Sequence, residues 1–280
     1  MTSSREKYFQ SMAAWLCFEV ASGFEVFIVC KTALVTGAAN GIGSATVRKL
    51  VSHGATHILA LDRDQSGLAA LVSEMADSVD IIPVVLDLEN MDVYEQLLEP
   101  YLNDIGQLDT VVISHGVSDE NELAEHQVWD KVMNINLNAT RYLLSLLEKK
   151  LGQGSSVVVI SSILAKVGKQ RNTAYCSSKH GLMGLVKGLA LDWARLGIRV
   201  NAVLPSWVDT PMLRRELQKQ GDMTGASMNQ MLRQIKKRIP LRSLVSAEDI
   251  ADSIIFLASP QAKMITAQSL VVDGGDGCGV

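Results

Sequence analysis

Thr36-Gly37-Ala38-Ala39-Asn40-Gly41-Ile42-Gly43 is the stretch that decides the fold. It follows a short β-branched run at Thr32–Thr36 and opens an amphipathic segment at Ile42–His53, so it occupies the turn from a strand to a helix. Glycines at such a turn let the backbone approach a pyrophosphate at the positive end of the helix. An ordinary glycine-rich turn would contain the same glycines, but the strand–turn–helix context favours a dinucleotide-binding loop.

On both sides of this loop the sequence alternates between β-branched runs and amphipathic segments, as in a parallel sheet covered by helices. The expected strands are Thr32–Thr36, Thr56–Asp62, Ile81–Leu86, Thr110–Ser114, Ser156–Ser161, Arg199–Leu204 and Ser269–Val272. The expected helices are Ile42–His53, Gly67–Ala76, Val93–Leu102, Val128–Lys149, Ala174–Leu196 and Ala247–Leu257. We therefore expect an α/β fold, a single Rossmann-type doubly wound parallel sheet of about seven strands with helices on both faces.

Length and composition limit the possible functions. With 280 residues, 48% of them hydrophobic, the chain can bury one large core, so we expect one domain at 31–280 after an N-terminal extension at 1–30. The net charge is −4 and the charges are interspersed, which predicts no nucleic-acid partner. The cysteines form no CxxC pair and have no histidine at metal-ligand spacing, which favours reduced thiols in the cytoplasm and predicts no disulfide and no metal site.

The N-terminal extension has two interpretations. Arg5 and Lys7 precede a short apolar run at Met12–Phe18, a pattern that faintly resembles a signal peptide. However, Glu19 follows that run directly, and Glu19 and Glu25 interrupt the most apolar stretch before it reaches the roughly 20 residues of a membrane span. We therefore expect no membrane segment and an extension that packs on the core or on a partner subunit.

The segment 206–240 breaks the strand–helix rhythm. It is polar, contains four methionines and carries a basic cluster at Arg233–Arg238. We interpret it as a mobile substrate lid over a cleft.

The glycine spacing GxxxGxG, in place of GxGxxG, resembles that of the short-chain dehydrogenase/reductase family, classical type, and the resemblance extends from Lys31 to about Gly275. In that family the residue that ends the second strand selects the cofactor, and Asp62 matches it. A carboxylate there can bind ribose hydroxyls and repels a 2′-phosphate, so the resemblance implies NAD, with NADP less favoured. Asn40 supports NAD because NADP-dependent members often carry a basic residue there, whereas Arg63 argues mildly for NADP.

By the same resemblance, the cofactor contacts lie in the glycine-rich loop, at the ends of the strands and in the catalytic helix. The implied residues are Gly37, Asn40, Gly41, Ile42, Gly43, Asp62, Arg63, Asp87, Leu88, Ser114, Gly116, Tyr175, Lys179, Pro205, Val208 and Thr210.

Tyr175 and Lys179 form a Tyr-x-x-x-Lys pair at the start of a predicted helix, where this spacing places both side chains on one face. A nearby ammonium lowers a phenol pKa, which would make Tyr175 a workable acid or base. Because such a pair is common by chance on solvated helices, its surroundings matter. Ser162 and Asn136 match the family's substrate-orienting serine and the asparagine at its helix kink.

The resemblance gives these four residues distinct roles. Ser162 would bind the substrate oxygen, Tyr175 would exchange its proton, Lys179 would also hold the nicotinamide ribose, and Asn136 would support a proton relay. Each residue has a purely structural alternative, as a turn residue, a buried polar group or a solvated charge. Their occurrence together in the family's order favours catalysis.

Three positions depart from the family pattern. Ile113-Ser114-His115-Gly116 stands where Asn-Asn-Ala-Gly is usual, and we expect Ser114 to help tie the strands while His115 is structural rather than catalytic. Ser206 replaces a glycine and would be strained if that position needed a positive φ. Ala267 stands where glycine is common.

These features predict an NAD-dependent oxidoreductase that interconverts a secondary alcohol and a ketone, with Tyr175 as acid or base. A 3-oxoacyl-thioester reductase is a close alternative, and a catalytically weak dinucleotide-binding regulatory protein is another. The glycine spacing argues against a sugar-nucleotide epimerase. Family members commonly form tetramers or dimers, so a homotetramer or homodimer is expected.

The substrate is expected to be small and partly apolar. The candidate wall residues of its cavity are Leu164, Val167, Trp207, Leu213 and the methionines Met212, Met223, Met228 and Met231. Arg214, Arg215 or the cluster Arg233–Arg238 could recognise a carboxylate, a phosphate or a CoA group, although such charges are more often the solvated face of a lid.

Overall fold

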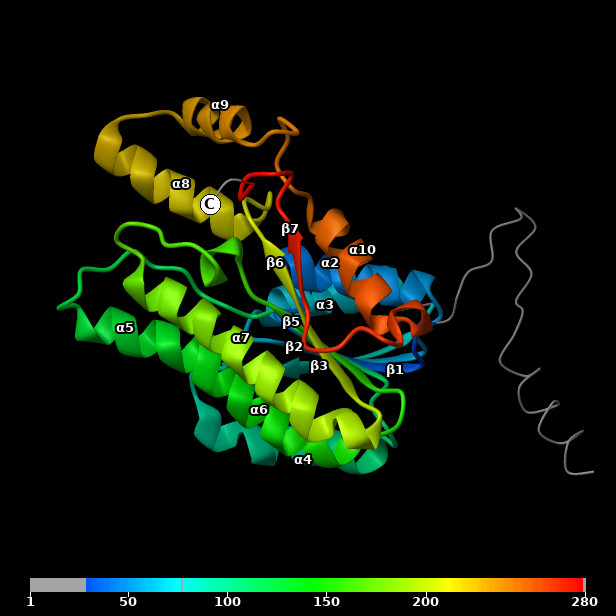
Figure 1. The fold of residues 1–280 in the computed structure, drawn as a ribbon. Coiled ribbons are helices and arrows are strands. Elements are labelled where there is room, and N and C mark those ends of the chain that lie inside the picture. Colours follow the sequence, from blue (N-terminus) through cyan, green and yellow to red (C-terminus); the bar gives the residue numbers. More distant parts are fainter. Residues whose placement is uncertain (1–28, 77, 279–280) are drawn as a thin grey trace, which may run out of the picture.

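The computed structural model describes residues 29–76 and 78–278. Almost all of the predicted extension at 1–30, including the signal-peptide alternative, lies outside the described residues. In the described part, a single sheet lies between two layers of helices (Figure 1). No helix of this part is long and apolar enough to cross a membrane.

Seven parallel strands form the sheet in the order β3-β2-β1-β4-β5-β6-β7. Their bounds are β1 Thr32–Thr36, β2 His57–Asp62, β3 Asp80–Val85, β4 Thr110–Ile113, β5 Ser156–Ile160, β6 Arg199–Pro205 and β7 Ser269–Val272. The predicted α/β class and doubly wound sheet are therefore confirmed, with strand ends that differ by one residue at most. The strand order reverses between β1 and β4, and in such sheets ligands bind outside the carboxyl ends of the strands at that point.

Alternate residues of each strand pack against opposite helix layers. Leu34 belongs to the core under one helix layer, whereas its neighbour Val35 belongs to the core under the other. Both side chains are fully buried, which explains why the strands read as continuous apolar runs. The first layer contains α4 Tyr94–Asp104, α5 His126–Met133, α6 Ala139–Leu147 and α7 Thr173–Trp193, and the second contains α2 Gly41–Ser52, α3 Gln65–Met75 and α10 Ala247–Ala258.

The predicted single helix Val128–Lys149 is interrupted. A π-helical segment at Asn134–Asn138 separates α5 from α6, and a short 3-10 turn follows α6. Periodicity could not show this break, because one extra residue in a turn leaves the apolar pattern on either side intact.

The segment 206–240 is more regular than we predicted. It contains two helices, α8 Pro211–Thr224 and α9 Met228–Arg238, which we call the α8–α9 arm. Thr210 and Ser227 cap these helices through their side chains, and Pro211 occupies the first turn of α8. The arm lies beyond the carboxyl ends of the strands, where it packs around its own small apolar core.

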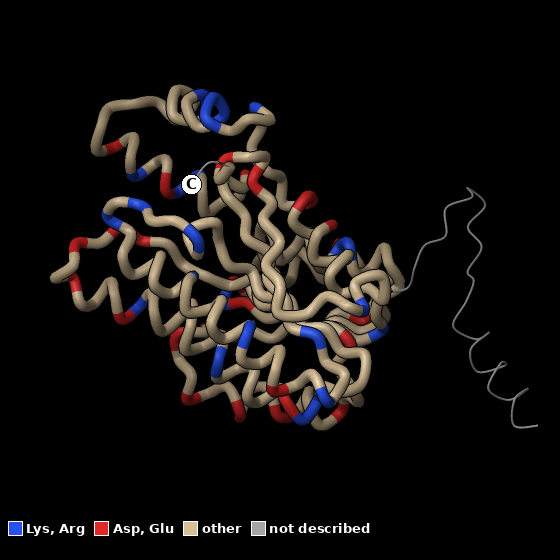
Figure 2. Tube along the Cα trace, viewed as in Figure 1, with Lys and Arg blue, Asp and Glu red and all other residues tan. Residues whose placement is uncertain are grey.

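Basic and acidic residues are interspersed along most of the described chain, with several basic residues on α9 (Figure 2). Three of these basic residues, Lys236, Lys237 and Arg238, lie in the last turn of that helix. Cations there stabilise the negative end of the helix dipole, which accounts for their placement.

Candidate active site

The glycine-rich loop turns sharply from β1 into α2. Gly37 has φ +64°, and a Cβ on Gly43 would lie 2.0 Å from the Gly37 carbonyl oxygen, so a larger residue at position 43 would displace the turn. Asn40 precedes α2 without a side-chain cap, so no side chain there blocks the N–H groups of its first turn. This open helix N-terminus above a close backbone turn fits a dinucleotide pyrophosphate.

An acidic edge borders the loop. Asp62 accepts hydrogen bonds from the backbone N–H groups of Ala39 and Asp64, each at 3.0 Å, and thereby ties β2 to the glycine-rich loop. Asp64 in turn accepts from the Asn40 side chain at 3.0 Å and caps α3 at Gly67. These hydrogen bonds lower the pKa of Asp64 to about 2. Two carboxylates therefore stand at this edge, of which the sequence analysis had identified one.

The other predicted cofactor residues near this edge differ in exposure. Arg63 is exposed. Asp87 is exposed as well, and its side chain accepts from the Glu89 N–H at 3.0 Å. Leu88 is buried, and its carbonyl accepts from the Tyr94 hydroxyl at 2.7 Å.

Thr36 joins the end of β1 to the end of β4. Its hydroxyl oxygen accepts from the N–H groups of Ser114 at 3.0 Å and His115 at 3.3 Å. The strand-tying role expected of the Ser114 side chain is thus filled by the Thr36 side chain, which bonds to backbone. Gly116 follows, and a Cβ there would meet Asn136 Oδ1 at 3.3 Å and Lys179 Nζ at 3.4 Å.

His115 is a bridge between β1 and the π-helical segment. Its Nδ1 lies 2.8 Å from the Thr36 hydroxyl, and its Nε2 lies 3.0 Å from the Ile135 carbonyl. Because a carbonyl only accepts, Nε2 carries the hydrogen and Nδ1 accepts from Thr36. Burial, aided by the Lys179 charge, lowers the pKa of His115 to about 4, so the ring is neutral at physiological pH. These contacts agree with the expected structural role.

Asn136 is buried in the π-helical segment, and both the oxygen and the nitrogen of its side chain are hydrogen-bonded. Oδ1 accepts from the Val117 N–H at 2.8 Å, while Nδ2 donates to the Val117 carbonyl and to the Ser178 hydroxyl, both at 3.0 Å. The Thr140 hydroxyl donates to the Asn136 carbonyl at 2.9 Å. The loop after β4, the helix break and α7 therefore meet at this one residue.

The first turns of α7 bring Tyr175 and Lys179 to the carboxyl end of β5. Lys179 is buried, donates to the Ile160 carbonyl at 3.0 Å and lies 5.5 Å from the centre of the Tyr175 ring. Ser162 follows β5, caps a 3-10 turn by accepting from the Leu164 N–H at 3.1 Å, and lines the same cavity as Tyr175. Ser162, Tyr175 and Lys179 thus line one cavity of about 390 Å³.

The pKa values of this group correct one expectation. Burial chiefly raises the pKa of Tyr175 to about 12, against an opposing effect of the Ser162 hydroxyl, so the predicted lowering by Lys179 is absent. Burial also lowers the pKa of Lys179 to about 8. Its ammonium is directed to the Ile160 carbonyl, and Tyr175 is protonated at neutral pH.

The loop after β6 forms another side of the cavity. Pro205 ends β6, Val208 is buried, and Thr210 caps α8 while its hydroxyl donates to the Val208 carbonyl at 3.3 Å. Ser206 does not have a positive φ, so the strain that we considered there is absent. Its hydroxyl oxygen is buried without a hydrogen-bond partner. An orphaned polar group at this wall fits the carboxamide of a nicotinamide, which can both donate and accept.

The apolar wall is smaller than predicted. Leu164, Val167, Trp207 and Leu213 line the cavity, as expected. Among the four methionines only Met212 does so. The candidate basic residues differ in position. Arg238 lines the cavity, whereas Arg214 does not line it and pairs with Asp209 at 2.9 Å.

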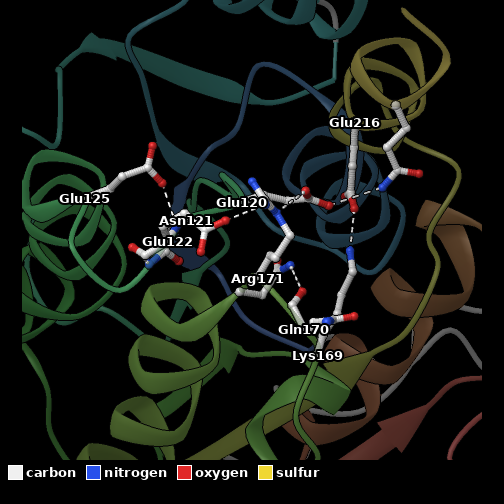
Figure 3. A network of polar contacts seen from close by, with 10 residues as sticks. Glu120, Asn121, Glu122, Glu125, Lys169, Gln170, Arg171 and Glu216 are labelled. Carbon is white, nitrogen blue, oxygen red and sulfur yellow. Dashed lines mark hydrogen bonds and ion pairs between the residues drawn. The ribbon is translucent and has the colours of Figure 1, made fainter. Parts of the chain in front are cut away.

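Ion pairs join the loops after β4 and β5 to one another and to α8 (Figure 3). Lys169, from the loop after β5, lies 2.6 Å from Glu216 of α8. Arg171 pairs with Glu122 and lies 3.6 Å from Glu120, both in the loop after β4. Lys169 and Glu216 also line the cavity, so the pair faces the space in which Tyr175 and Ser162 lie.

Comparison with known proteins identifies the family. A family model described as Enoyl-(Acyl carrier protein) reductase matches residues 37–276. A 3-oxoacyl-[acyl-carrier-protein] reductase from Thermotoga maritima is 33% identical over 254 residues, which cover 88% of this chain and 97% of that protein. This chain belongs to the short-chain dehydrogenase/reductase family. It is an oxidoreductase of that family, acting between alcohol and keto groups with a nicotinamide cofactor.

Other similar members of the family differ in their substrates. An L-rhamnose 1-dehydrogenase (NAD(P)(+)) from Azotobacter vinelandii is 30% identical over 89% of this chain and 98% of its own length. The crystal structure of an actinorhodin polyketide ketoreductase with NADPH has a TM-score of 0.79 at 31% identity, with 88% of this chain and 97% of that chain covered. The proteins that resemble this short-chain dehydrogenase/reductase thus include both a sugar dehydrogenase and a polyketide ketoreductase.

Sequence reasoning missed several residues of this site. Asp64 could have been found, because an acidic residue at the start of a predicted helix is a cap signal. Thr36, Lys169 and Glu216 gave no such signal. Their importance comes from contacts between segments that are far apart in sequence, such as the ion pair between Lys169 and Glu216.

Proposed function

We propose that this short-chain dehydrogenase/reductase uses NAD(H) to interconvert a secondary alcohol and a ketone, with Tyr175 as the acid or base. The observation that carries the proposal is the meeting of Ser162, Tyr175 and Lys179 in one cavity beside the glycine-rich loop. A nicotinamide supplies the hydride when it is bound. The residues of the chain bind the substrate and the cofactor, orient them and move the proton.

Each residue has a role that its contacts support. Ser162 would hydrogen-bond the substrate oxygen, and the hydroxyl of Tyr175 would deliver a proton to that oxygen during ketone reduction. A tyrosine protonated at neutral pH suits this direction. Lys179 would hold the nicotinamide ribose, and Asn136, fixed by its three side-chain hydrogen bonds, would anchor the relay that restores the proton.

The acidic edge supports NAD over NADP. A 2′-phosphate at the end of β2 would approach both Asp62 and Asp64, and these two carboxylates would repel its negative charge. Asn40 is held by Asp64 and offers no positive charge to a phosphate. The exposed Arg63 is the only opposing charge within 62–64.

The test measures reduced-nicotinamide absorbance with NAD or NADP and a panel of secondary alcohols and ketones. We expect turnover with NAD, and a loss of at least about 100-fold in Tyr175→Phe, because general acid–base catalysis contributes on this scale. Dinucleotide titration of Tyr175→Phe is the matched control, and binding should persist. Turnover that survives in Tyr175→Phe would contradict the assignment, and a preference for NADP would contradict the role of Asp62.

Reduction of a 3-oxoacyl thioester is a second candidate. It is favoured by the apolar wall formed by Leu164, Val167 and Trp207 and by the similarity to 3-oxoacyl-[acyl-carrier-protein] reductases. Turnover of a 3-oxoacyl thioester at a kcat/KM well above that of short ketones would favour this candidate.

We further propose a cytoplasmic homotetramer or homodimer. Exposed apolar side chains on α10 and β7, Phe256 and Leu270, support association through this edge of the sheet. The free cysteines Cys30, Cys176 and Cys278 support a reducing compartment. A solution mass equal to one 30.4 kDa chain at micromolar concentration would contradict the proposed oligomer.

A further inference from the structure

The charged side chains of the arm and its neighbouring loops enter the substrate cavity in pairs. Lys169 Nζ lies 2.6 Å from Glu216 Oε1, with side chains 28% and 21% exposed. Arg238 lies 3.8 Å from Asp276, and both residues also line the cavity. Among the described residues of this lining, only Lys179 is a cation without a carboxylate partner, and it donates to the Ile160 carbonyl. Lys169 is thus the cation of this lining that is hydrogen-bonded to a carboxylate, whereas Arg238 is 68% exposed and lies beyond hydrogen-bond distance of Asp276.

Lys169 is held from two sides. Besides Glu216, its ammonium lies 5.3 Å from the centre of the Trp207 ring, within the range of a cation–π contact. Figure 3 shows Lys169 and Glu216 pointing toward one another, from the loop after β5 and from α8. Glu216 is also close enough to Tyr175 that its charge adds to the rise in the pKa of that tyrosine. The pair thus lies near the reacting end of the cavity.

This arrangement favours neutral substrates. A carboxylate that approached Lys169 would have to share the ammonium with Glu216, and the two negative charges would repel in a partly shielded space. A neutral ester, thioester or hydroxyl could accept a hydrogen bond from Lys169 without that repulsion. Resting on the proposed function, we propose that Glu216 is a specificity-determining residue that masks Lys169 and restricts this enzyme to uncharged ketones and alcohols, excluding free oxo acids.

A purely structural role for the pair leads to a different outcome. The Lys169–Glu216 pair also fixes α8 to the loop after β5, as Lys219 fixes α8 to Asp119 of the loop after β4 at 3.0 Å. Asp119 does not line the cavity. Asp119→Asn is therefore a matched control, because it removes one negative charge and one contact of α8 but frees no cation inside the cavity.

The experiment compares 4-oxopentanoate with its methyl ester, which differ mainly in charge. For each variant, kcat/KM is measured with NADH, and the affinity of the enzyme with bound NADH is measured by calorimetry. We expect the unmodified protein to favour the ester. Glu216→Gln should raise the ratio of kcat/KM for the acid to kcat/KM for the ester by about 10-fold to 100-fold. A charge-assisted hydrogen bond between the substrate carboxylate and the freed Lys169 ammonium strengthens binding by about this factor. The double variant Lys169→Gln with Glu216→Gln should cancel the gain, and Asp119→Asn should leave the ratio unchanged.

Three outcomes would overturn the inference: a preference of the unmodified protein for the acid, an unchanged ratio in Glu216→Gln, or an equal rise in Asp119→Asn. If Glu216→Gln does not fold, Lys169→Gln is the test. It leaves the Glu216 carboxylate unpaired in the cavity, which should lower the acid-to-ester ratio below that of the unmodified protein. An unchanged ratio would contradict the masking role. Failure of the proposed function is distinguishable. In that case neither ketone is reduced, while the affinity ratio from calorimetry still tests the masking of Lys169.

Discussion

Ala267 has φ +59°, a left-handed conformation that residues with a Cβ rarely adopt. It lies just before β7, and its N–H donates to the Val200 carbonyl at 2.8 Å. This hydrogen bond fixes the strained backbone conformation. We expect Ala267→Gly to raise the free energy of unfolding by about 0.5–1 kcal/mol, because the relief of strain exceeds the greater freedom of glycine in the unfolded chain. Urea unfolding measures this change. Ala69→Gly, on the exposed face of α3, should instead destabilise by about 1 kcal/mol, and equal losses in both variants would contradict the explanation.

His115 makes the stability depend on pH. Its pKa is lowered to about 4 in the fold, against 6.5 for a free histidine, so the unfolded chain takes up the proton first as the pH falls. The stability that neutral His115 contributes is complete above about pH 6.5 and is lost progressively down to about pH 4, by about 1–3 kcal/mol. Urea unfolding between these pH values should therefore show a flatter profile for His115→Gln, which keeps a donor for the Ile135 carbonyl. The exposed His126→Gln is the control, and the same flattening there would refute the assignment.

Helix α7 depends on a cap from a distant loop. Asn121 is buried, its Oδ1 accepts from the Ala174 N–H at 3.2 Å and its Nδ2 donates to the Thr173 hydroxyl at 2.8 Å. Asn121→Ala should destabilise the protein by about 1–2 kcal/mol, as lost helix caps do, and should lower kcat as well, because α7 carries Tyr175. Ser246→Ala removes the capping box of α10 and should cost similar stability while kcat is kept. Equal kcat values in the two variants would show that the cap has no influence on the site.

The elements show how far the sequence could be interpreted. The strands were predictable because buried parallel strands are short apolar runs, as in Val157–Val159, whose residues are fully buried. The helices of the arm were not, because α8 buries only Leu213 and Leu217 in its small core and the rest of its surface is polar. The position of Asn136 was predictable from the motif. Its contacts were not, since they depend on Val117 and Ser178, which only the folded chain brings near.

For the whole molecule, the sheet and the α8–α9 arm are expected to differ in stability, because the arm has a separate small core. The predicted mobility of this segment stays a prediction, and hydrogen exchange tests it. We expect the amides of α8 and α9 to exchange at least about tenfold faster than those of β5, and to slow when NADH and a ketone are added, because a lid that covers ligand is ordered by it. Asp119→Asn should speed exchange in α8 but not in β5, since it removes the contact with Lys219. If the arm exchanges as slowly as β5 without ligand, the arm is as rigid as the sheet and the prediction of a mobile lid is wrong.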